Sequence, residues 1–497
     1  MTDRYIVVLD EGTTSTRAIL YAPDGTVIAT KGHELDQHYP APGRVEHDAV
    51  QIWQRTLACA RAVIERAGGA DRIAAIGITN QRETVVAWDR SNGQPIHRAI
   101  VWQDRRTTDF CETLRNGGHE TEVQRRTGLL LDPYFSGTKM RWIIDNVPEA
   151  RALGDNLALG TIESWLVWNL TSGGEGQGGG LHISDASNAS RTLLFPLVGD
   201  SWDAGLADLF GVPLAALPEV TDTHGRFGHT HPDLFGAAIP ICGLVGDQQS
   251  ATIGQGCLSP GETKATFGTG AFILTNMGEA VPHSGNRLLG TILHQSGGQR
   301  HYALEGSVFV AGSLIQWLRD GLGLLETSAE SEQLARSVSD NGGVTLVPAL
   351  TGLGAPHWQP QARGSISGLT LGSSKAHIVR AALESMAHQC HDLMSAFAAD
   401  GAGWDRLRID GGMSANDWMA QDLADMLNLP VERPADVETT ALGAAMCAAV
   451  GAGLYPTLAD ASANMRPDTA AFAPAMADDV RAERLAAWRA ALAKVMA

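Results

Sequence analysis

The sequence predicts an α/β protein with two large domains and a cleft between them. The chain has 497 residues, of which 44% are hydrophobic, and single cores stop growing at roughly 250 to 300 residues. A meander of short strands, a helix and a buried strand open the chain, and a similar strand order returns about half a chain later. This recurrence indicates a duplicated fold. We place the boundary between Asp247 and Gly261, which gives domains of residues 1–250 and 251–497.

Two apolar runs and two turns predict the N-terminal meander. Residues 6–9 and 18–21 are apolar, and Gly12 begins the polar turn between them. The Asp-Gly pair at 24–25 reverses the chain again into a third strand that begins at Val27. We therefore expect three antiparallel strands before any helix.

A helix and a buried strand follow the meander. Apolar residues recur at helical spacing from residue 48 to 67, and one face of this helix carries Ile52, Trp53, Leu57, Ala60 and Ile64. Residues 73–79 form an apolar run of strand length that leads into polar residues at 80–83.

The second half repeats the strand–turn–strand order and then becomes helical. Residues 264–267 run into a Gly-Thr-Gly turn at 268–270, and residues 271–274 leave it. Apolar periodicity predicts later helices at residues 307–319, 376–398, 415–427 and 478–496. The Ala- and Gly-rich stretch at 441–454 is shorter than the roughly 18 residues of a membrane span, so we expect a packed helix there.

Charge and cysteine content narrow the functional classes. A net charge of −18 argues against nucleic acid or an anionic membrane as a partner, because such binding needs a basic surface. The six cysteines are far apart and lack Cys/His ligand spacing, so we expect neither a disulfide framework nor a zinc site. The N-terminus lacks the charged and apolar regions of a signal peptide. A soluble cytoplasmic protein is expected.

The turn after the first predicted strand is a candidate phosphate-binding site. Gly permits close backbone approach, hydroxyls donate to phosphate oxygens, Arg neutralises charge, and Asp holds magnesium through water. The side chains in question belong to Asp10, Thr13, Thr14, Ser15 and Arg17. An ordinary polar hairpin turn is the alternative, and residue types alone favour it. The second turn at 268–270 shifts the balance, since two turns facing each other across a cleft would grip a polyphosphate.

Two further polar segments follow predicted strands. Asp247 comes after the apolar run at 239–245 and begins a helix, so its carboxylate could take the proton of an attacking hydroxyl and approach a metal ion; a helix N-cap is the alternative. Residues 410–416 follow the strand at 407–409, and their paired glycines could admit adenine or ribose. A tight strand-to-helix turn is the alternative there.

A polyol site needs paired donors and acceptors beside an apolar wall. Candidates for this site are Arg82, Glu83, Trp102, Tyr134, Gln248 and Phe272. Each one alone is explained as well by a surface ion pair or by core packing. Their joint occurrence with the phosphate turns makes the polyol site credible.

The chain resembles the FGGY carbohydrate kinases along its whole length. The matching stretches are residues 80–84 (NQRET), 99–103 (AIVWQ), 132–139 (DPYFSGTK), 188–192 (NASRT) and 351–356 (TGLGAP). The resemblance implies two ribonuclease H-like domains, as in actin and the sugar-kinase ATPases, with ATP and substrate in the interdomain cleft. Within the family the likeness is to members that phosphorylate glycerol with ATP and Mg²⁺ to give sn-glycerol 3-phosphate. Assembly as a dimer or tetramer is also implied.

The resemblance assigns roles to individual residues. Asp247 would be the general base, and Asp10 and Asp247 would lie at the metal. Residues implied to contact glycerol are Arg82, Glu83, Trp102, Tyr134, Asp247, Gln248 and Phe272. Residues implied to contact the nucleotide are Thr13, Thr14, Ser15, Arg17, Thr269, Gly312, Gln316, Gly412 and Asn416.

Departures from the family pattern keep alternatives open. Glu11 stands where Gln is frequent, which adds a negative charge near the phosphates unless its side chain points away; Glu163 stands where Asp is usual. Kinases of longer substrates, such as xylulose, ribulose, gluconate or erythritol, are the nearest alternative, and Trp102, Tyr134 and Phe272 argue against them by walling in a small pocket. A nucleotide-driven switch or an inactive sugar sensor of the same fold is a more distant hypothesis.

Overall fold

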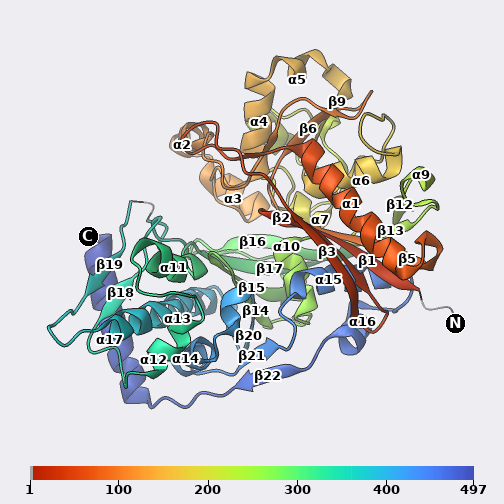
Figure 1. Ribbon diagram of the computed structural model, residues 1–497. Helices are drawn as coiled ribbons and strands as arrows, with labels where there is room; N and C mark the ends of the chain where they lie inside the picture. The colour runs from red at the N-terminus through yellow and green to blue at the C-terminus, as the bar shows by residue number, and fades with distance from the viewer. Residues whose placement is uncertain (1–3, 360) are drawn as a thin grey trace.

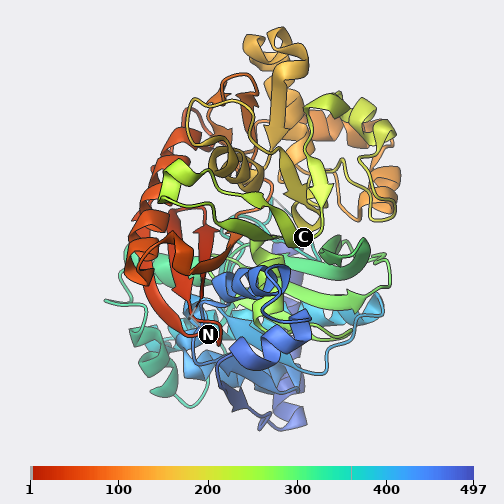
Figure 2. The same ribbon diagram turned by 90° about the vertical axis from the view of Figure 1, so that its right-hand side faces the viewer.

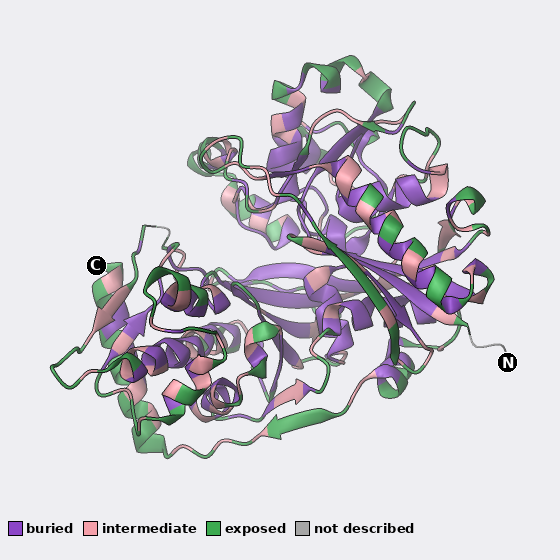
Figure 3. Cartoon of the chain, in the orientation of Figure 1, coloured by how far each residue is buried: buried purple, intermediate pink, exposed green. Residues whose placement is uncertain are grey.

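The computed structural model describes residues 4–359 and 361–497 and shows two lobes, each built around a mixed sheet (Figure 1). The central strands of both sheets are buried, whereas the edge strands β3 and β22 and the outer faces of helices such as α1 and α17 are exposed (Figure 3). No helix in the described ranges is long and apolar enough to cross a membrane.

The N-terminal sheet has six strands, and the predicted meander forms three of them. β1 pairs antiparallel with β2, and β2 with β3, while β5 runs parallel to β1 and β13 runs parallel to β5. In spatial order the strands are β12 (His224–His229), β13 (Pro240–Gly246), β5 (Ile73–Asn80), β1 (Tyr5–Glu11), β2 (Ser15–Tyr21) and β3 (Val27–Glu34).

The C-terminal sheet repeats this plan with seven strands. β14 and β15 form the predicted hairpin around residues 268–270, and β20 runs parallel to β14 as β5 runs parallel to β1. The spatial order is β16 (Leu289–Ser296), β17 (Gln299–Val308), β15 (Ala271–Gly278), β14 (Thr263–Phe267), β20 (Leu407–Asp410), β21 (Val431–Pro434) and β22 (Thr469–Phe472). The predicted duplication of an α/β fold is confirmed.

Most of the predicted helices form where the pattern placed them. α1 (Ala49–Ala67) begins after Asp48, whose carboxylate caps the backbone N–H groups of Val50 and Gln51. Its predicted face packs on the N-terminal sheet, with Leu57 only partly buried. In the C-terminal lobe α13 (Lys375–Ala399), α14 (Asp417–Leu427) and α17 (Asp478–Met496) match the prediction closely.

The helix predicted at residues 307–319 begins too early. Ser307 belongs to β17 and pairs with Phe272 of β15, so sheet pairing overrides the apolar periodicity at this point. The helix α11 (Gly312–Gln316) starts later and continues into one π turn (Trp317–Gly321).

Smaller elements extend each lobe. The N-terminal lobe adds the strands β4 (Glu46–His47), β6 (Val86–Asp89), β7 (Gln94–Pro95), β8 (Ala99–Ile100), β9 (Leu157–Gly160), β10 (Ile183–Asp185) and β11 (Glu219–Thr221). Its further helices are α2 (Thr108–Asn116), α3 (Glu120–Thr127), α4 (Ser136–Asn146), α5 (Pro148–Ala152), α6 (Ile162–Ser172), α7 (Ala186–Ala189), α8 (Ala204–Phe210) and α9 (Pro232–Phe235). The C-terminal half adds α12 (Glu330–Arg336), β18 (Thr345–Val347), β19 (Ser365–Ser367) and α16 (Leu458–Met465).

One helix from the C-terminal half completes the core of the N-terminal lobe. α15 (Thr439–Gly451) packs with α10 (Asp247–Gly254) against β1, β5 and β13, and the blue helices lie beside the red strands in Figure 2. The approach is close because glycines face it: a Cβ at Gly77 would lie 2.6 Å from the carbonyl oxygen of Ala444. α15 therefore links the C-terminal half of the chain to the core of the N-terminal lobe.

We expect Gly77→Ala to lower the free energy of unfolding by about 1–3 kcal/mol, because the backbone of α15 cannot move away from the added methyl group. Chemical denaturation followed by circular dichroism measures the change. Gly403→Ala is the control, because nothing lies within 4 Å of a Cβ at that position. Equal unfolding midpoints for the two variants would contradict the close packing.

Candidate active site

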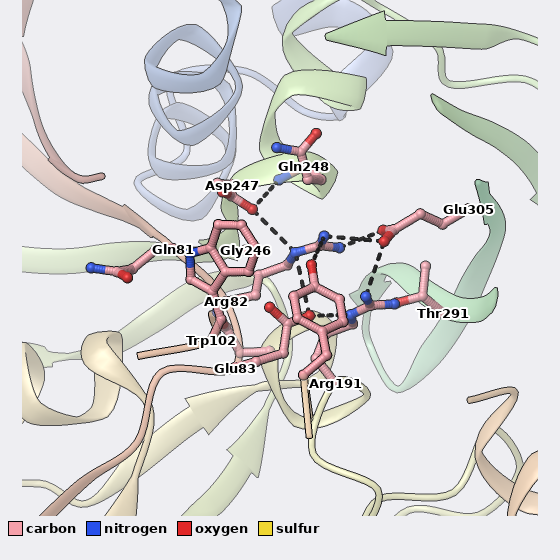
Figure 4. Close-up of polar contacts among 12 residues, drawn as sticks. Gln81, Arg82, Glu83, Trp102, Arg191, Gly246, Asp247, Gln248, Thr291 and Glu305 are labelled. Atoms are coloured by element: carbon pink, nitrogen blue, oxygen red, sulfur yellow. Dashed lines mark hydrogen bonds and ion pairs between the residues drawn. The ribbon is translucent and has the colours of Figure 1, made fainter. Parts of the chain in front are cut away.

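Four buried side chains of alternating charge form the floor of the site (Figure 4). Arg82 Nη1 lies 2.6 Å from Glu305 Oε2, Arg191 Nη2 lies 3.0 Å from Glu305 Oε1, and Arg191 Nε lies 2.6 Å from Glu83 Oε1. All four side chains are at most 2% exposed. Burial acts to raise the pKa of Glu305, but Arg191 and Arg82 outweigh it and hold that pKa at about 2. Glu305 is therefore ionised, whereas burial raises the pKa of Glu83 against the opposing effect of Arg82 and Arg191.

Sequence analysis missed two members of this network. Arg191 lies in one of the stretches that carry the family resemblance, and no role was assigned to it. Glu305 comes from β17 and is the one charged side chain in its fully buried part, residues 302–308. A lone charge in a buried strand is rarely left unpaired, and that signal could have indicated Glu305.

The backbone at Glu83 has an unusual conformation. Its φ angle is 62°, in the left-handed region that residues other than glycine rarely adopt. The ion pair with Arg191 holds the side chain, and the hydroxyl of Ser136 donates to the carbonyl oxygen of Glu83. Such conformations persist where the surroundings over-determine them, and they cluster at functional sites.

Asp247 lies at the edge of the network, directly after β13. Its Oδ1 lies 3.1 Å from Arg82 Nε in an ion pair and accepts from the backbone N–H of Gln248 at 2.7 Å. Gly246, not Asp247, is the N-cap of α10, so the helix-cap interpretation is wrong. The Asp247 side chain is 31% exposed, and burial raises its pKa against the opposing effect of Arg82 and Lys264. A carboxylate held this way can accept a proton from a bound hydroxyl.

Gln248 has its orientation set by a lysine that sequence analysis also missed. The buried Lys264 Nζ donates to Gln248 Oε1 at 2.6 Å and to Thr266 Oγ1 at 2.9 Å. Because its oxygen is occupied, Gln248 presents its amide N–H groups as donors. Phe272 pairs with Thr266 across β14 and β15 and therefore shares this face of the sheet.

Two aromatic rings lie beside the charged floor. Trp102 and Tyr134 meet edge to face with centroids 5.5 Å apart, and Arg82 Nη2 donates to the Tyr134 hydroxyl at 3.3 Å. The structure thus brings Arg82, Glu83, Tyr134 and Asp247 together, with Trp102 against Tyr134.

The N-terminal turn lies at the same sheet edge as Asp247. In the parallel pairing, Asp10 is opposite Thr79 and Gly246 is opposite Asn80. Asp10 near the end of β1 and Asp247 directly after β13 therefore lie at the same sheet edge, on either side of β5. Arg17 pairs with Asp10 at 2.6 Å and with Glu438 at 2.8 Å. Of the predicted hydroxyl residues, Thr14 is exposed, and Thr13 and Ser15 are half-buried.

The turn at residues 268–270 lies beside several of the residues predicted to contact the nucleotide. The backbone N–H of Gly312 donates to the carbonyl of Gly268 at 2.9 Å, and that of Ser313 donates to the carbonyl of Thr269 at 3.1 Å. Gln316 ends α11, which begins at Gly312.

Gly412 and Asn416 lie after β20, whose Asp410 pairs with Thr266 of β14 beside this turn. Asn416 Oδ1 caps α14 and its amide donates to Ser331. The Asn416 side chain thus has the role expected in a tight strand-to-helix turn. That turn was the alternative to nucleotide binding for residues 410–416.

Both acidic departures are buried and hydrogen-bonded inside the N-terminal lobe. Glu11 Oε1 accepts from the hydroxyls of Thr16 and Thr56 at 2.5 Å each, on the side of β1 covered by α1. Burial raises the pKa of Glu11 to about 8. Glu163 is also buried, accepts from Asn80 at 3.0 Å, and has its pKa raised to about 7 by burial.

The sequence comparisons agree with this architecture. Residues 5–254 match the N-terminal domain of the FGGY family of carbohydrate kinases, and residues 263–452 match its C-terminal domain. The chain belongs to the FGGY family of carbohydrate kinases. Glycerol kinase of Methylobacterium nodulans is 52% identical over 98% of this chain and 97% of its own length, and that of Alcanivorax borkumensis is 51% identical over 99% and 98%.

Solved structures include FGGY kinases of the same fold. The crystal structure of Plasmodium falciparum glycerol kinase with ADP matches with a TM-score of 0.93 and 33% identity, covering 100% of this chain and 99% of that chain. The predicted fold of two ribonuclease H-like domains is therefore confirmed.

In this FGGY kinase we expect Glu305→Gln to lower the free energy of unfolding by about 3–5 kcal/mol, because it leaves two buried guanidinium groups without their shared carboxylate. Glu332→Gln is the control: its surface pair with Arg336 should contribute only about 0–1 kcal/mol. Denaturant titration of both variants measures the difference. Similar small losses would show that the buried network contributes little.

Glu11→Gln tests the buried protonated carboxyl. With a pKa raised from 4.5 to about 8, folded Glu11 keeps a proton that the unfolded chain releases between these pH values. Wild-type stability should therefore fall as pH rises through this window, by about 1.4 kcal/mol per pH unit from this group. The variant has no such proton. The free energy of unfolding of Glu11→Gln minus that of wild type should therefore increase from roughly pH 5 to pH 8, the interval between the unfolded and folded pKa values.

Unfolding free energies of wild type and Glu11→Gln at several pH values measure this trend. Glu483→Gln, on the exposed side of α17, is the control and should follow the wild type throughout. A constant difference between Glu11→Gln and wild type would mean that Glu11 is ionised in the folded protein.

Proposed function

We propose that this FGGY kinase transfers the γ-phosphoryl group of ATP to glycerol, giving ADP and sn-glycerol 3-phosphate. The observation that carries the proposal is the convergence of Arg82, Tyr134, Asp247 and Gln248 on one site. The full-length similarity to glycerol kinases supports the choice of substrate.

Asp247 is proposed as the general base. It takes the proton of the terminal hydroxyl while the oxygen of that hydroxyl attacks the γ-phosphorus in line, and the bond to the β-phosphate oxygen breaks with its electron pair leaving on ADP. Arg82 fixes one carboxylate oxygen at 3.1 Å, and the partial exposure of the side chain lets a substrate reach it. Catalysis then rests on positioning and charge neutralisation.

Glycerol is proposed to bind between the charged floor and the aromatic rings. Arg82, Glu83 and Tyr134 offer donors and acceptors to its hydroxyls, Gln248 offers N–H donors, and Trp102 and Phe272 cover its carbons. Each of these polar groups already has a partner that orients it. A small triol fits paired polar groups on one side and an apolar wall on the other.

ATP is proposed to lie between the two turns. Thr13, Thr14, Ser15 and Arg17 would face its phosphates from the N-terminal lobe, and residues around Thr269, Gly312, Gln316, Gly412 and Asn416 would face the nucleotide from the C-terminal lobe. The paired hairpins at equivalent places in the two sheets support this arrangement. Asn416 has partners on its side chain and on its backbone, since its N–H donates to Met413 and its carbonyl accepts from Ala420; its proposed nucleotide contact rests on the family resemblance alone.

Magnesium is proposed to accompany ATP near Asp10 and Asp247. No group of three or more His, Cys, Asp or Glu residues that could hold a metal occurs within residues 4–359 and 361–497. The two carboxylates fit Mg²⁺, which in kinase sites takes one or two carboxylates together with water and substrate phosphates. When bound, the ion offsets the charge of the phosphate oxygens.

Assembly and location are also proposed. We propose a homo-oligomer, a dimer or tetramer, on the strength of family resemblance alone. A cytoplasmic location is supported by the six cysteines, all of which are buried and free.

The proposal predicts ADP release that depends on glycerol and magnesium. The purified protein is assayed with ATP, Mg²⁺ and, in turn, glycerol, dihydroxyacetone, erythritol, xylulose, ribulose and gluconate. Glycerol should be the preferred substrate, and Asp247→Asn should lower kcat by about 10²–10⁴-fold, because the variant cannot accept the proton. Turnover only with a longer substrate would replace glycerol but keep the mechanism, and ATP hydrolysis independent of substrate would indicate a nucleotide switch.

A further inference from the structure

A closed ring of hydrogen bonds surrounds the backbone of the N-terminal turn. Gln37 Nε2 donates to the carbonyl oxygen of Thr13 at 2.9 Å, and Gln81 Nε2 donates to that of Gly12 at 3.1 Å. His47 lies between the two amides: its Nε2 is 2.9 Å from Gln37 Oε1, and its Nδ1 is 3.4 Å from Gln81 Nε2. The imidazole thus joins the side chains that hold two consecutive carbonyls of the turn.

The ring determines the tautomer of His47. Gln37 Nε2 donates to the carbonyls of Thr13 and Leu35, so the amide cannot be flipped and Oε1 must act as an acceptor. His47 Nε2 therefore carries a hydrogen, and Nδ1 is the acceptor for Gln81. His47 is 1% exposed, and burial lowers its pKa to about 4, so the neutral ring that this arrangement requires is the form present at neutral pH.

A second branch connects the ring to the aromatic wall. Thr84 Oγ1 donates to Gln81 Oε1 at 2.9 Å and accepts from the backbone N–H of Trp102 at 3.2 Å. The indole Nε1–H of Trp102 donates to Thr13 Oγ1 at 2.9 Å. Because the Thr13 oxygen accepts this bond, its own hydrogen stays available to donate to an anionic group.

The backbone of His47 is held by regular secondary structure. It belongs to the short strand β4, which pairs with β8, and the next residue, Asp48, is the N-cap of α1. Both imidazole nitrogens contact side chains, Gln37 and Gln81, that donate hydrogen bonds to the backbone of the turn. A side chain that only filled space would not need two amides of fixed orientation.

We propose that His47 is a positioning residue for phosphoryl transfer, acting through Gln37 and Gln81 to hold the Gly12–Thr13 backbone and the Thr13 hydroxyl where they meet the nucleotide phosphates. The inference rests on the proposed function. It adds that the polyol wall and the phosphate turn share one hydrogen-bonded unit, through Trp102. Loss of His47 should weaken nucleotide contacts before glycerol contacts, because Arg82, Tyr134 and Asp247 lie outside the ring.

The test compares His47→Phe, which keeps a planar ring without either bond, with His47→Gln, which restores one donor and one acceptor. His47→Phe should raise the KM for ATP and the calorimetric Kd for ADP by about tenfold, the effect of one or two lost hydrogen bonds. His47→Gln should recover part of that loss, and glycerol affinity should change by less than about twofold in both. His388→Phe, a buried histidine stacked on Trp488 in the other lobe, is the control with unchanged kinetics.

Three results would overturn the inference: wild-type KM for ATP and Kd for ADP in His47→Phe, equal losses in His47→Phe and His47→Gln, or equal losses of ATP and glycerol affinity. If His47→Phe does not fold, Gln37→Met decides, since it removes the bond to Thr13 at a half-buried position and should show the same selective loss. ADP binding is measured independently of turnover, so failure of glycerol phosphorylation in the wild type would reject the proposed function while still leaving the positioning of the turn to be judged.

Discussion

The ion pairs of Glu305 join the two halves of the chain at the active site. Glu305 belongs to the C-terminal sheet, whereas its partners Arg82 and Arg191 belong to the N-terminal half. Two arginines and two glutamates are paired within this buried cluster, and Asp247 lies at its exposed edge. A buried charge without a partner costs several kcal/mol, about 3–5 when one partner of a pair is removed. The geometry around Asp247 therefore depends on both halves being in place.

The duplicated sheets explain why chemistry-bearing residues gather where they do. In each sheet a hairpin is followed by a parallel strand, so the hairpin turn and the next strand end lie at one edge. Polar groups at such edges are free of ladder hydrogen bonds and can bind ligands. The Arg17–Glu438 ion pair connects β2, next to the N-terminal turn, to the residue that precedes α15 in the C-terminal half of the chain.

Much of this could be predicted from sequence because local patterns determined it. The meander follows short apolar runs and turn residues, α1, α13 and α17 follow apolar periodicity, and the strand-end positions of Asp10 and Asp247 follow from the predicted strands. Contacts between distant segments could not be predicted. Arg191 and Glu305 meet across 114 positions, and Ser307 entered β17 because of a partner in β15. Apolar periodicity carries no information about such pairs. For Arg191 the one signal was its position in residues 188–192, a stretch that matches the FGGY family.

Neighbouring side chains also determine which polar groups of the site act as donors and which as acceptors. Lys264 donates to the oxygen of Gln248 and so fixes the amide with its N–H groups as the free donors, and Trp102 donates to the oxygen of Thr13, whose own hydrogen remains a donor. Arg82 occupies one oxygen of Asp247 and leaves the carboxylate as an acceptor. Acceptors and donors are thus assigned before any ligand arrives. At the proposed site, a ligand would match that pattern with a hydroxyl proton toward Asp247 and lone pairs toward Gln248 and Thr13, because a mismatched buried group costs about 1–3 kcal/mol.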